Sequence, residues 1–558
     1  MKFARFLIVF CVACGLSATA TGADEAQRDI RLVLQITVDG LRGDLLDRYA
    51  DGFGDKGFNY LLRSGTVYTN ARYRHANTET IVGHTTLATG AQPSKHGMIG
   101  NVWFDREAKQ LSYNIEDADA PLLPTREDEK EFEQVDPAQQ LARTQGRSPR
   151  AIQVPGIGDA LAAYTGGRAR IFGVSGKDRS AVAMAGHVGK AFWYSASNGD
   201  FVTSRYYYPE YPDWVTAWNA ERSADGYAGR DWQLRSAITT YLLGHQDDRP
   251  YEVDLKGYGR VFPHRFGDTG SKLFYTQLLI SPIGDERLLD FSKTLIENEQ
   301  IGQDAIPDYL SISFSAVDAV NHFFGPSSLE NEVVVNRLDD TLARLFEYID
   351  ETVGLEHSLI VLSADHGMAE MPEYMTELGY DAGRLEPDDI VTAANAAGEQ
   401  LGIRELVRFF YRPYLYLDED KIAAAKLNRA QVEQYVADSL TEMQGINRAV
   451  STRNLPDLPP SPLIEQVRNN RHVTRSGDIY IIQEPYWFLF DEGPIASMHG
   501  SPWLYDAHVP IMFAGPGITP KRVGRLVEPA DVAPTVAAVL GMTPPAASTG
   551  QPLVEVFD

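Results

Sequence analysis

Short, mostly apolar segments alternate along the chain with longer stretches in which apolar residues recur at helical spacing. Five such segments are predicted strands: residues 33–38, 171–174, 309–317, 359–364 and 509–513. Between them, residues 329–349 have the periodicity of an amphipathic helix, and a last helix is expected over about 531–540. Strands that alternate with helices are typical of an α/β fold with a largely parallel central sheet.

Three stretches do not follow this alternation. Residues near 105–150 are acidic and punctuated by proline, which predicts a solvated surface insertion. Residues near 192–265 are rich in tyrosine and tryptophan, and residues near 372–500 mix helix and strand patterns. We expect all three to be insertions in one catalytic domain, residues 24–558.

The first residues have the pattern of an export signal. Lys2 and Arg5 precede an apolar stretch from Phe6 to Leu16, and small residues follow it. This apolar stretch is too short to span a bilayer, so no stable membrane anchor is expected. We therefore expect residues 1–23 to be cleaved and the protein to be periplasmic or secreted.

Composition narrows the chemistry that is possible. Both cysteines, Cys11 and Cys14, lie in the expected signal, so the mature chain offers neither a thiolate ligand nor a cysteine nucleophile. The chain has 51 basic and 76 acidic residues and a formal charge of −25. We expect it not to bind nucleic acid or anionic lipid surfaces, and an anionic ligand would need locally placed positive charge.

Acidic residues follow three of the predicted strands. Asp39, Asp318 and Asp365 each come directly after an apolar segment, and His366 adjoins the last of them. A single carboxylate in this position is often only a helix cap or a turn former. Because ligands of open α/β sheets bind at the carboxyl ends of the strands, we expect these side chains to converge on one site.

Two more histidines extend this set. His322 follows Asp318 by four residues, which places both side chains on one face of a helix, and His499 lies in a glycine-marked loop. Three aspartates and three histidines suit two cations, and imidazole-rich coordination favours zinc. Two such ions can stabilise the attacking and leaving oxygens of a phosphoryl transfer.

Without cysteine, a nucleophile has to be an oxygen. Thr80 lies at the start of a predicted helix that runs to Gly90. A helix N-terminus favours an alkoxide and binds phosphate oxygens. Spacing alone leaves Thr78, Thr85 and Thr86 as alternatives.

Several separated motifs together resemble the alkaline phosphatase superfamily, and among its branches the PafA-type phosphatases with a threonine nucleophile. In chain order they are Asp39, Thr80 in Thr78-x-Thr80-x-x-Gly83-His84, Asn101 in Gly100-Asn101-x-Trp103-Phe104-Asp105, Gly176-Lys177-Asp178-Arg179, Asp318-x-x-x-His322, Asp365-His366-Gly367-Met368 and His499-Gly500-Ser501. The resemblance covers nearly the whole mature chain. It implies an alkaline-phosphatase-like three-layer sandwich with a mostly parallel central sheet and large insertions.

The resemblance also implies roles for the motif residues. The implied ligands of one Zn²⁺ are Asp39, Asp365, His366 and Thr80, and those of the second Zn²⁺ are Asp318, His322 and His499. Thr80 is the implied nucleophile, and Asn101, Lys177 and Arg179 are the implied phosphate-binding groups.

Lys177 and Arg179 favour phosphate monoesters as small-molecule substrates, because a monoester carries more negative charge than a diester. The resemblance implies that the phosphodiesterase and nucleotide pyrophosphatase branch shares the metal ligands but lacks this pair. A phosphodiesterase or a broad-specificity phosphatase is therefore the alternative. A sulfatase is disfavoured by the absence of a mature cysteine, and a binding protein on an inactive scaffold by the intact motifs.

The remaining histidines have simpler interpretations. His508 is the rival of His499 as a metal ligand. We expect His84 to pack or hydrogen-bond behind the nucleophile helix, and His187 to line the site or cap a strand. The aromatic stretch near 192–265 either shapes the leaving-group side of the site or is ordinary core.

Overall fold

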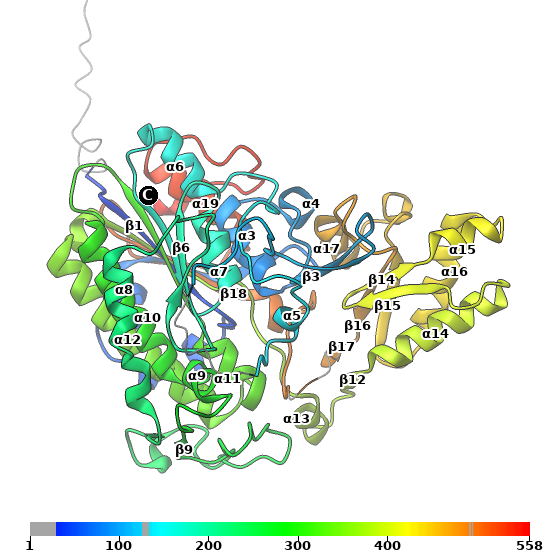
Figure 1. The fold of residues 1–558 in the computed structure, drawn as a ribbon, viewed down its shortest axis with the longest axis horizontal. Coiled ribbons are helices and arrows are strands. Elements are labelled where there is room, and N and C mark those ends of the chain that lie inside the picture. The colour runs from blue at the N-terminus through cyan, green and yellow to red at the C-terminus, as the bar shows by residue number, and fades with distance from the viewer. Residues whose placement is uncertain (1–28, 125–132, 490–492, 494, 558) are drawn as a thin grey trace, which may run out of the picture.

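The computed structural model describes residues 29–124, 133–489, 493 and 495–557. The expected export signal, residues 1–23, and the acidic run at 127–131 lie outside the described residues. Figure 1 shows a large body, coloured from blue to green and again in red, and a lobe in yellow and orange that extends from it. None of the helices in the described part of the chain combines the length and the apolar character needed to cross a bilayer.

A nine-stranded sheet forms the centre of the body, in the order β19-β2-β18-β11-β1-β10-β5-β6-β7. Its strands are β1 (Leu32–Val38), β2 (Thr66–Arg72), β5 (Ile171–Ser175), β6 (Lys190–Tyr194), β7 (Phe201–Val202), β10 (Asp308–Phe314), β11 (Ser358–Ser363), β18 (His508–Ala514) and β19 (Lys521–Val523). The pairs β11–β1, β1–β10, β10–β5, β5–β6 and β19–β2 are parallel, whereas β18 runs antiparallel to β11 and β2. The prediction of a mostly parallel α/β sheet is confirmed.

Two groups of helices cover this sheet (Figure 1). One group contains α3 (Thr80–Thr89), α6 (Ile157–Thr165), α7 (Asp178–Ala185) and α19 (Val532–Val539), and the other contains α10 (Pro282–Glu299), α11 (Ala316–Phe324) and α12 (Leu329–Thr352). The helix predicted at 329–349 is α12, and its stripe from Val334 to Ile349 is buried. Since helices lie on both sides of the strands, the body has three layers.

The predicted strand at 309–317 is three residues too long. β10 ends at Phe314, and Ala316 and Val317 already belong to α11. An apolar run cannot be divided between a buried strand and a buried helix by periodicity, which explains the error. As a consequence, Asp318 lies in the first turn of a helix and does not directly follow a strand.

The stretch near 105–150 is not simply a solvated surface insertion. It begins with a hairpin of β3 (Val102–Asp105) and β4 (Gln110–Tyr113) and also contains the short helix α5 (Pro137–Gln140). Arg147 is 8% exposed, and Asp136 contacts a buried arginine of α7. Part of this stretch therefore packs against the body at the motif of residues 176–179.

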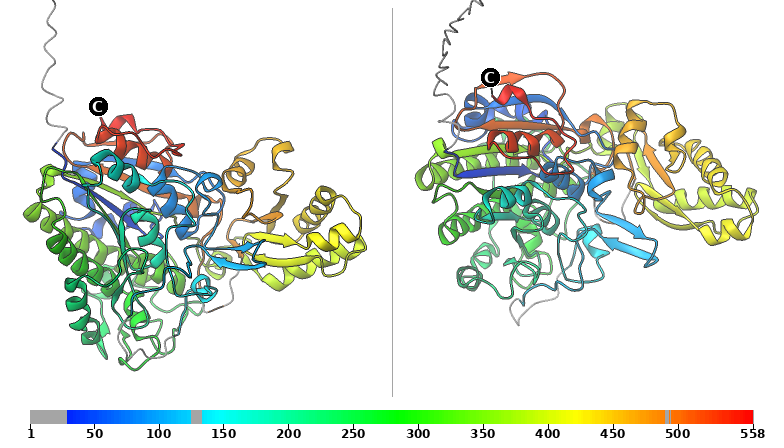
Figure 2. Two further views of the ribbon diagram at one scale, coloured as in Figure 1. Left: turned by 45° about the horizontal axis from the view of Figure 1, so that its top comes forward. Right: turned by 90° about the horizontal axis from the view of Figure 1, so that it is seen from above.

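The other two stretches differ from each other. The stretch near 192–265 begins inside β6, so its first residues belong to the central sheet, and it continues through α8 (Asp213–Ala220) and the ribbon of β8 (Asp231–Trp232) with β9 (His264–Arg265). Most of the stretch at 372–500 forms the lobe (Figure 2). The lobe contains α14 (Pro387–Gln400), α16 (Arg429–Thr441) and a second sheet in the order β13 (Val407–Tyr411), β14 (Tyr414–Leu417), β16 (Ile479–Gln483) and β15 (Ile446–Ser451). A separate apolar cluster, which includes Leu415 and Ile479, stabilises it.

Candidate active site

The three predicted aspartates meet where the central strands β11, β1 and β10 end. Asp39 follows β1, Asp365 lies two residues after β11, and Asp318 is in the first turn of α11, and all three are fully buried. Gly40 allows this approach, because its φ is +72° and a Cβ there would lie 3.0 Å from the Cβ of Asp318.

The histidines complete two groups of potential ligands. In the described part of the chain, Asp39, Asp365 and His366 form one group and Asp318, His366 and His499 form the other, with the ligand atoms of each group within 4.8 Å of one another. The Nε2 atom of His322 lies 3.4 Å from Oδ2 of Asp318, as their four-residue spacing predicts. The residues proposed from the sequence as ligands thus lie together.

Main-chain carbonyl groups orient all three histidines. The Nδ1 atom of His322 lies 2.9 Å from the oxygen of Ser497, and that of His366 lies 2.8 Å from the oxygen of Gly367. The Nδ1 atom of His499 lies 2.8 Å from the oxygen of Thr78. Because a carbonyl oxygen only accepts, each Nδ1 carries the hydrogen, which leaves each Nε2 as a metal ligand.

Some ligand oxygens have no other partner. Oδ1 of Asp39 and Oδ1 of Asp318 are buried and accept no hydrogen bond, and Oδ2 of Asp365 has only Nδ1 of His84 nearby, at 3.1 Å. The other oxygen of Asp365 accepts from the backbone N–H groups of Gly40 and His366, at 3.1 and 3.0 Å. Buried carboxylate oxygens without donors are costly unless a cation binds them, so the residues present fit a metal centre.

The electrostatics of the group agree with this interpretation. Burial and the charges of Asp318 and Asp365 raise the pKa of Asp39. Against the effect of burial, Asp365 and Asp39 raise the pKa of His366 to about 9. Burial and the neighbouring His366 lower the pKa of His499 well below its usual range. The negative potential that favours a proton on His366 also attracts a divalent cation.

The Thr80 hydroxyl lies next to these ligands. Thr80 is the first residue of α3, and its Oγ1 is 3.4 Å from Nε2 of His366. Two of the alternatives are engaged elsewhere: the hydroxyl of Thr78 donates to the oxygen of Ser501, and that of Thr86 donates to the oxygen of Val82. The geometry therefore favours Thr80 as the residue that faces the metal ligands.

The phosphate-binding candidates open onto the same cavity as the metal ligands. This cavity has a volume of about 860 Å³, and Asn101, Lys177, Arg179, His322 and His499 line it. It also has an apolar part, which includes Leu122, Trp193, Leu279, Phe323 and Met498. The first part of the predicted aromatic insertion does line this cavity, through Trp193, Tyr194, Ser195, Ala196, Ser197 and Val202.

Lys177 and Arg179 are buried, 8% and 4% exposed, and are not residues of a surface turn. The Nζ atom of Lys177 lies 2.8 Å from Oδ2 of Asp39 and also pairs with Asp318. Nη1 of Arg179 donates to Oδ2 of Asp136 at 2.6 Å. Lys177 is therefore fixed against two of the candidate metal ligands, and Arg179 is held by Asp136 in the lining of the same cavity.

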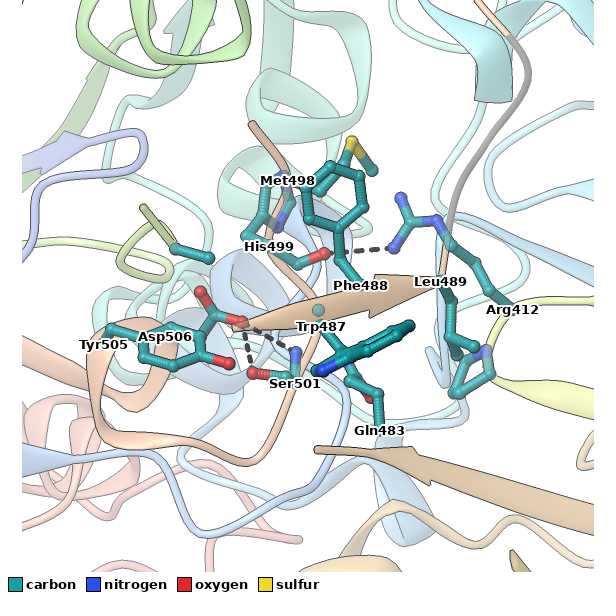
Figure 3. A pocket seen from close by; sticks show the side chains of 13 residues that line it. Arg412, Gln483, Trp487, Phe488, Leu489, Met498, His499, Ser501, Tyr505 and Asp506 are labelled. Carbon is teal, nitrogen blue, oxygen red and sulfur yellow. Dashed lines mark hydrogen bonds between the residues drawn. The ribbon is translucent and has the colours of Figure 1, made fainter. Parts of the chain in front are cut away.

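Figure 3 shows how the loop that carries His499 is fixed. Nη1 of Arg412 donates to the His499 oxygen at 3.0 Å. The backbone N–H and the hydroxyl of Ser501 both donate to Oδ2 of Asp506, at 2.9 and 2.5 Å. The loop is thus held from both sides.

Comparison with known proteins decides the family. Residues 33–502 match the model of the type I phosphodiesterase/nucleotide pyrophosphatase family. The chain belongs to this family, within the alkaline phosphatase superfamily. It is a hydrolase that acts on phosphate esters.

Two curated relatives agree with this assignment. Alkaline phosphatase PhoV of Synechococcus elongatus is 30% identical over 530 residues, which are 94% of this chain and 93% of PhoV. Alkaline phosphatase PafA of Elizabethkingia meningoseptica is 30% identical over 533 residues, 94% of each chain. A crystal structure of PafA superposes with a TM-score of 0.86 at 29% identity and covers 95% of this chain and 99% of PafA. The predicted alkaline-phosphatase-like fold is confirmed.

The other histidines of this family member do not join the metal ligands. His84 makes hydrogen bonds, as predicted, but it belongs to α3 itself: its Nδ1 is 2.9 Å from the Thr80 oxygen and 3.1 Å from Oδ2 of Asp365. His508, the rival of His499, has its Nε2 3.0 Å from the oxygen of Thr69. His187 pairs with Asp159 and does not cap a strand that ends at the metal ligands.

Asp285 on α10 is a residue that sequence reasoning missed. It is buried, and its Oδ1 accepts from the backbone N–H groups of Ser315 and Ala316 at 2.9 and 3.1 Å. Burial raises its pKa to about 7. Asp285 therefore caps the start of α11, which carries Asp318 and His322, from a different helix. No local capping pattern identifies this contact, because donor and acceptor are far apart in sequence.

Replacing Asp285 with alanine should weaken the start of α11. Two buried N–H groups would lose their acceptor, so we expect the free energy of unfolding to fall by about 1–2 kcal/mol. Asp285→Asn keeps one acceptor oxygen and should cost less. Denaturant unfolding of the three proteins measures the difference, and equal stabilities would contradict the capping role.

Proposed function

We propose that this protein is a secreted or periplasmic two-zinc alkaline phosphatase that hydrolyses phosphate monoesters through a phosphothreonine at Thr80. The observation that carries the proposal is the set of three histidines, each with its Nε2 free to bind a metal, facing three buried aspartates beside Thr80. Imidazole and carboxylate ligands in these numbers suit zinc.

The ligands divide into two sets. Asp39, Asp365, His366 and Thr80 would hold one ion, and Asp318, His322 and His499 would hold the other. When bound, the two ions would supply Lewis-acid stabilisation of the attacking and the leaving oxygen. The other roles in the proposed reaction, which are nucleophilic attack and phosphate binding, belong to residues of the chain.

In this proposal Thr80 attacks phosphorus. It begins α3, so the N-terminal end of the helix dipole favours its alkoxide form and the phosphate that it would carry. The bond between phosphorus and the leaving oxygen breaks as the bond to Oγ1 forms. Water then hydrolyses the phosphothreonine, which regenerates Thr80 and releases phosphate.

Asn101, Lys177 and Arg179 would bind the non-bridging oxygens. Oδ1 of Asn101 accepts from the Ile81 N–H at 3.3 Å, so the Nδ2 group of Asn101 is the one that can donate to phosphate. Lys177 and Arg179 add two charges that complement the dianionic group of a monoester. These charges are the basis for preferring monoesters over diesters.

The alternative is a phosphodiesterase or a broad-specificity phosphatase. The family description names phosphodiesterases, and a cavity of about 860 Å³ leaves room for a second substituent on phosphorus. Kinetics with an aryl phosphate monoester, its matching diester and a sulfate ester, together with metal analysis of the same sample, test the choice. We expect about two zinc ions per chain and the highest kcat/KM for the monoester. A higher kcat/KM for the diester would overturn the monoester assignment.

Asp136 provides a sharper test of the charge argument. Its carboxylate holds the guanidinium of Arg179, and Arg179 lowers the pKa of Asp136 despite its burial. Replacing Asp136 with asparagine should lower kcat/KM for monoesters about tenfold, because a charge-assisted hydrogen bond is lost. The diester, which needs Arg179 less, should be affected less.

Asp119→Asn is the matched control. Asp119 belongs to the same stretch, but its side chain is 89% exposed and lies 3.8 Å from Arg150. It should leave both reactions unchanged. An equal loss for monoester and diester in Asp136→Asn would argue against a charge-specific role of the pair.

A further inference from the structure

A buried ion pair connects the lobe to the residues around Thr80. Glu79 directly precedes Thr80 and is fully buried, and Arg412, in the turn between β13 and β14, is 7% exposed. Oε1 of Glu79 lies 3.2 Å from Nη2 of Arg412. The lobe thus places a charged side chain inside the body, next to the proposed nucleophile.

The contacts of this pair lead to functional residues on both sides. Oε2 of Glu79 accepts from the backbone N–H of Asn101 at 2.5 Å and from Nδ2 of Asn77 at 3.3 Å. Nη1 of Arg412 donates to the main-chain oxygen of His499 at 3.0 Å (Figure 3). The two side chains therefore join the segments that carry Thr80, Asn101 and His499.

Two glycines make room for these contacts. A Cβ on Gly500 would lie 2.8 Å from Nη1 of Arg412, and a Cβ on Gly100 would lie 2.9 Å from Oε2 of Glu79. Gly500 has a φ of +115°, which side chains other than glycine rarely adopt. Because both positions are glycines, the charged groups of Glu79 and Arg412 can approach the backbone closely enough to bond to the Asn101 N–H and the His499 oxygen.

We propose that the Glu79–Arg412 pair positions catalytic groups. Through this pair, the lobe holds the backbone N–H of Asn101 and the loop that carries His499 in their correct positions relative to Thr80. A buried ion pair adds little net stability, because desolvation offsets the attraction between the charges. Its directed contacts with three functional segments instead fix geometry, and small displacements of catalytic groups are costly. The lobe is then part of the catalytic centre and not an appended domain.

This inference rests on the proposed function, since it assigns the pair to the alignment of Thr80, Asn101 and His499. A double-mutant cycle tests it with Glu79→Gln, Arg412→Met and the combination in the full chain. We expect each single variant to lower kcat/KM for a monoester about tenfold to a hundredfold. The double variant should lose no more than the worse single variant, because the pair acts as a unit. Losses that multiply would overturn the coupling.

A matched control comes from β13, the strand that precedes Arg412. Arg408 on β13 pairs with Asp418 and Asp420 inside the lobe, at 3.1 and 3.3 Å. Arg408→Met removes a lobe ion pair without touching the body and should leave kcat/KM unchanged. Arg412→Lys keeps the charge and should recover part of the activity that Arg412→Met loses. If Arg408→Met lowered kcat/KM as much as Arg412→Met does, any lost ion pair in the lobe would have the same effect, and the proposal would be overturned.

Two further readouts separate positioning from plain stability. Glu79→Gln should raise the inhibition constant of inorganic phosphate, because the backbone N–H of Asn101 then bonds to a neutral acceptor in place of a charged one. In Arg412→Met, amide hydrogen exchange should accelerate in residues 496–501 and 407–417 but not in β10. A lower melting temperature with unchanged kinetics, phosphate binding and exchange would make the pair merely structural. The exchange measurement does not depend on catalysis. It therefore tests the positioning role of the pair even if the proposed phosphatase activity is not found.

Discussion

Replacing Thr80 with alanine should remove almost all turnover of phosphate monoesters. Oγ1 of Thr80 lies 3.4 Å from Nε2 of His366, one of the candidate metal ligands. Without this hydroxyl no covalent intermediate forms, so we expect kcat to fall by about a thousandfold or more. Steady-state kinetics with an aryl phosphate measure the loss, and metal analysis should find the metal content unchanged or nearly so.

Two variants make this test specific. Thr80→Ser keeps a hydroxyl at the start of α3 and should retain a substantial part of the activity. Thr86→Ala removes a hydroxyl from the same helix that donates to Val82 and should leave turnover close to that of the unmodified protein. Full activity of Thr80→Ala, or an equal loss in Thr86→Ala, would refute the assignment of the nucleophile.

Removing divalent cations should abolish activity and lower stability together. Asp39, Asp318 and Asp365 are fully buried close to one another, and Asp39 and Asp318 each have an oxygen that accepts no hydrogen bond. A cation that binds only the folded state stabilises it by about 4 kcal/mol when its free concentration is a thousand times the dissociation constant. We therefore expect a chelator to lower the melting temperature by several degrees, and added zinc to restore both stability and turnover.

Histidine variants identify the ligands in the same assay. His499→Ala should reduce the bound zinc and the activity, because its Nε2 faces Asp318 at 3.7 Å. His508→Ala, which removes a ring near Thr69, should change neither. Activity that survives complete chelation, or a loss of zinc in His508→Ala alone, would contradict the proposed metal centre.

Much of the site could be predicted because its ligands follow local patterns. β1 and β11 are short, mostly apolar segments, so the positions of Asp39 and Asp365 at the carboxyl ends of strands could be deduced. The four-residue step from Asp318 to His322 specified one helical face whether or not the end of β10 was placed correctly. A site prediction that depends on the spacing of two nearby residues stays correct even when the predicted end of a strand is wrong by a few residues.

The residues that sequence reasoning missed have partners far away in the chain. Asp136 lies in an acidic stretch that resembles a solvated loop, yet it binds Arg179. Glu79 and Arg412 are far apart in the chain and meet where the lobe contacts the body. Such pairs are determined by tertiary packing, which local propensity and periodicity do not contain.

The main-chain carbonyl groups that orient the three histidines have a consequence for how this site changes during evolution. The acceptors belong to the backbone of Thr78, Ser497 and Gly367, so no side chain has to be retained for each ring to keep its tautomer. Substitutions around the centre can therefore accumulate without altering which nitrogen is available. Sequences that share little beyond the ligands can therefore keep the same ligand geometry. Selection can then change the residues that line the cavity, which contact the part of the substrate beyond the phosphate.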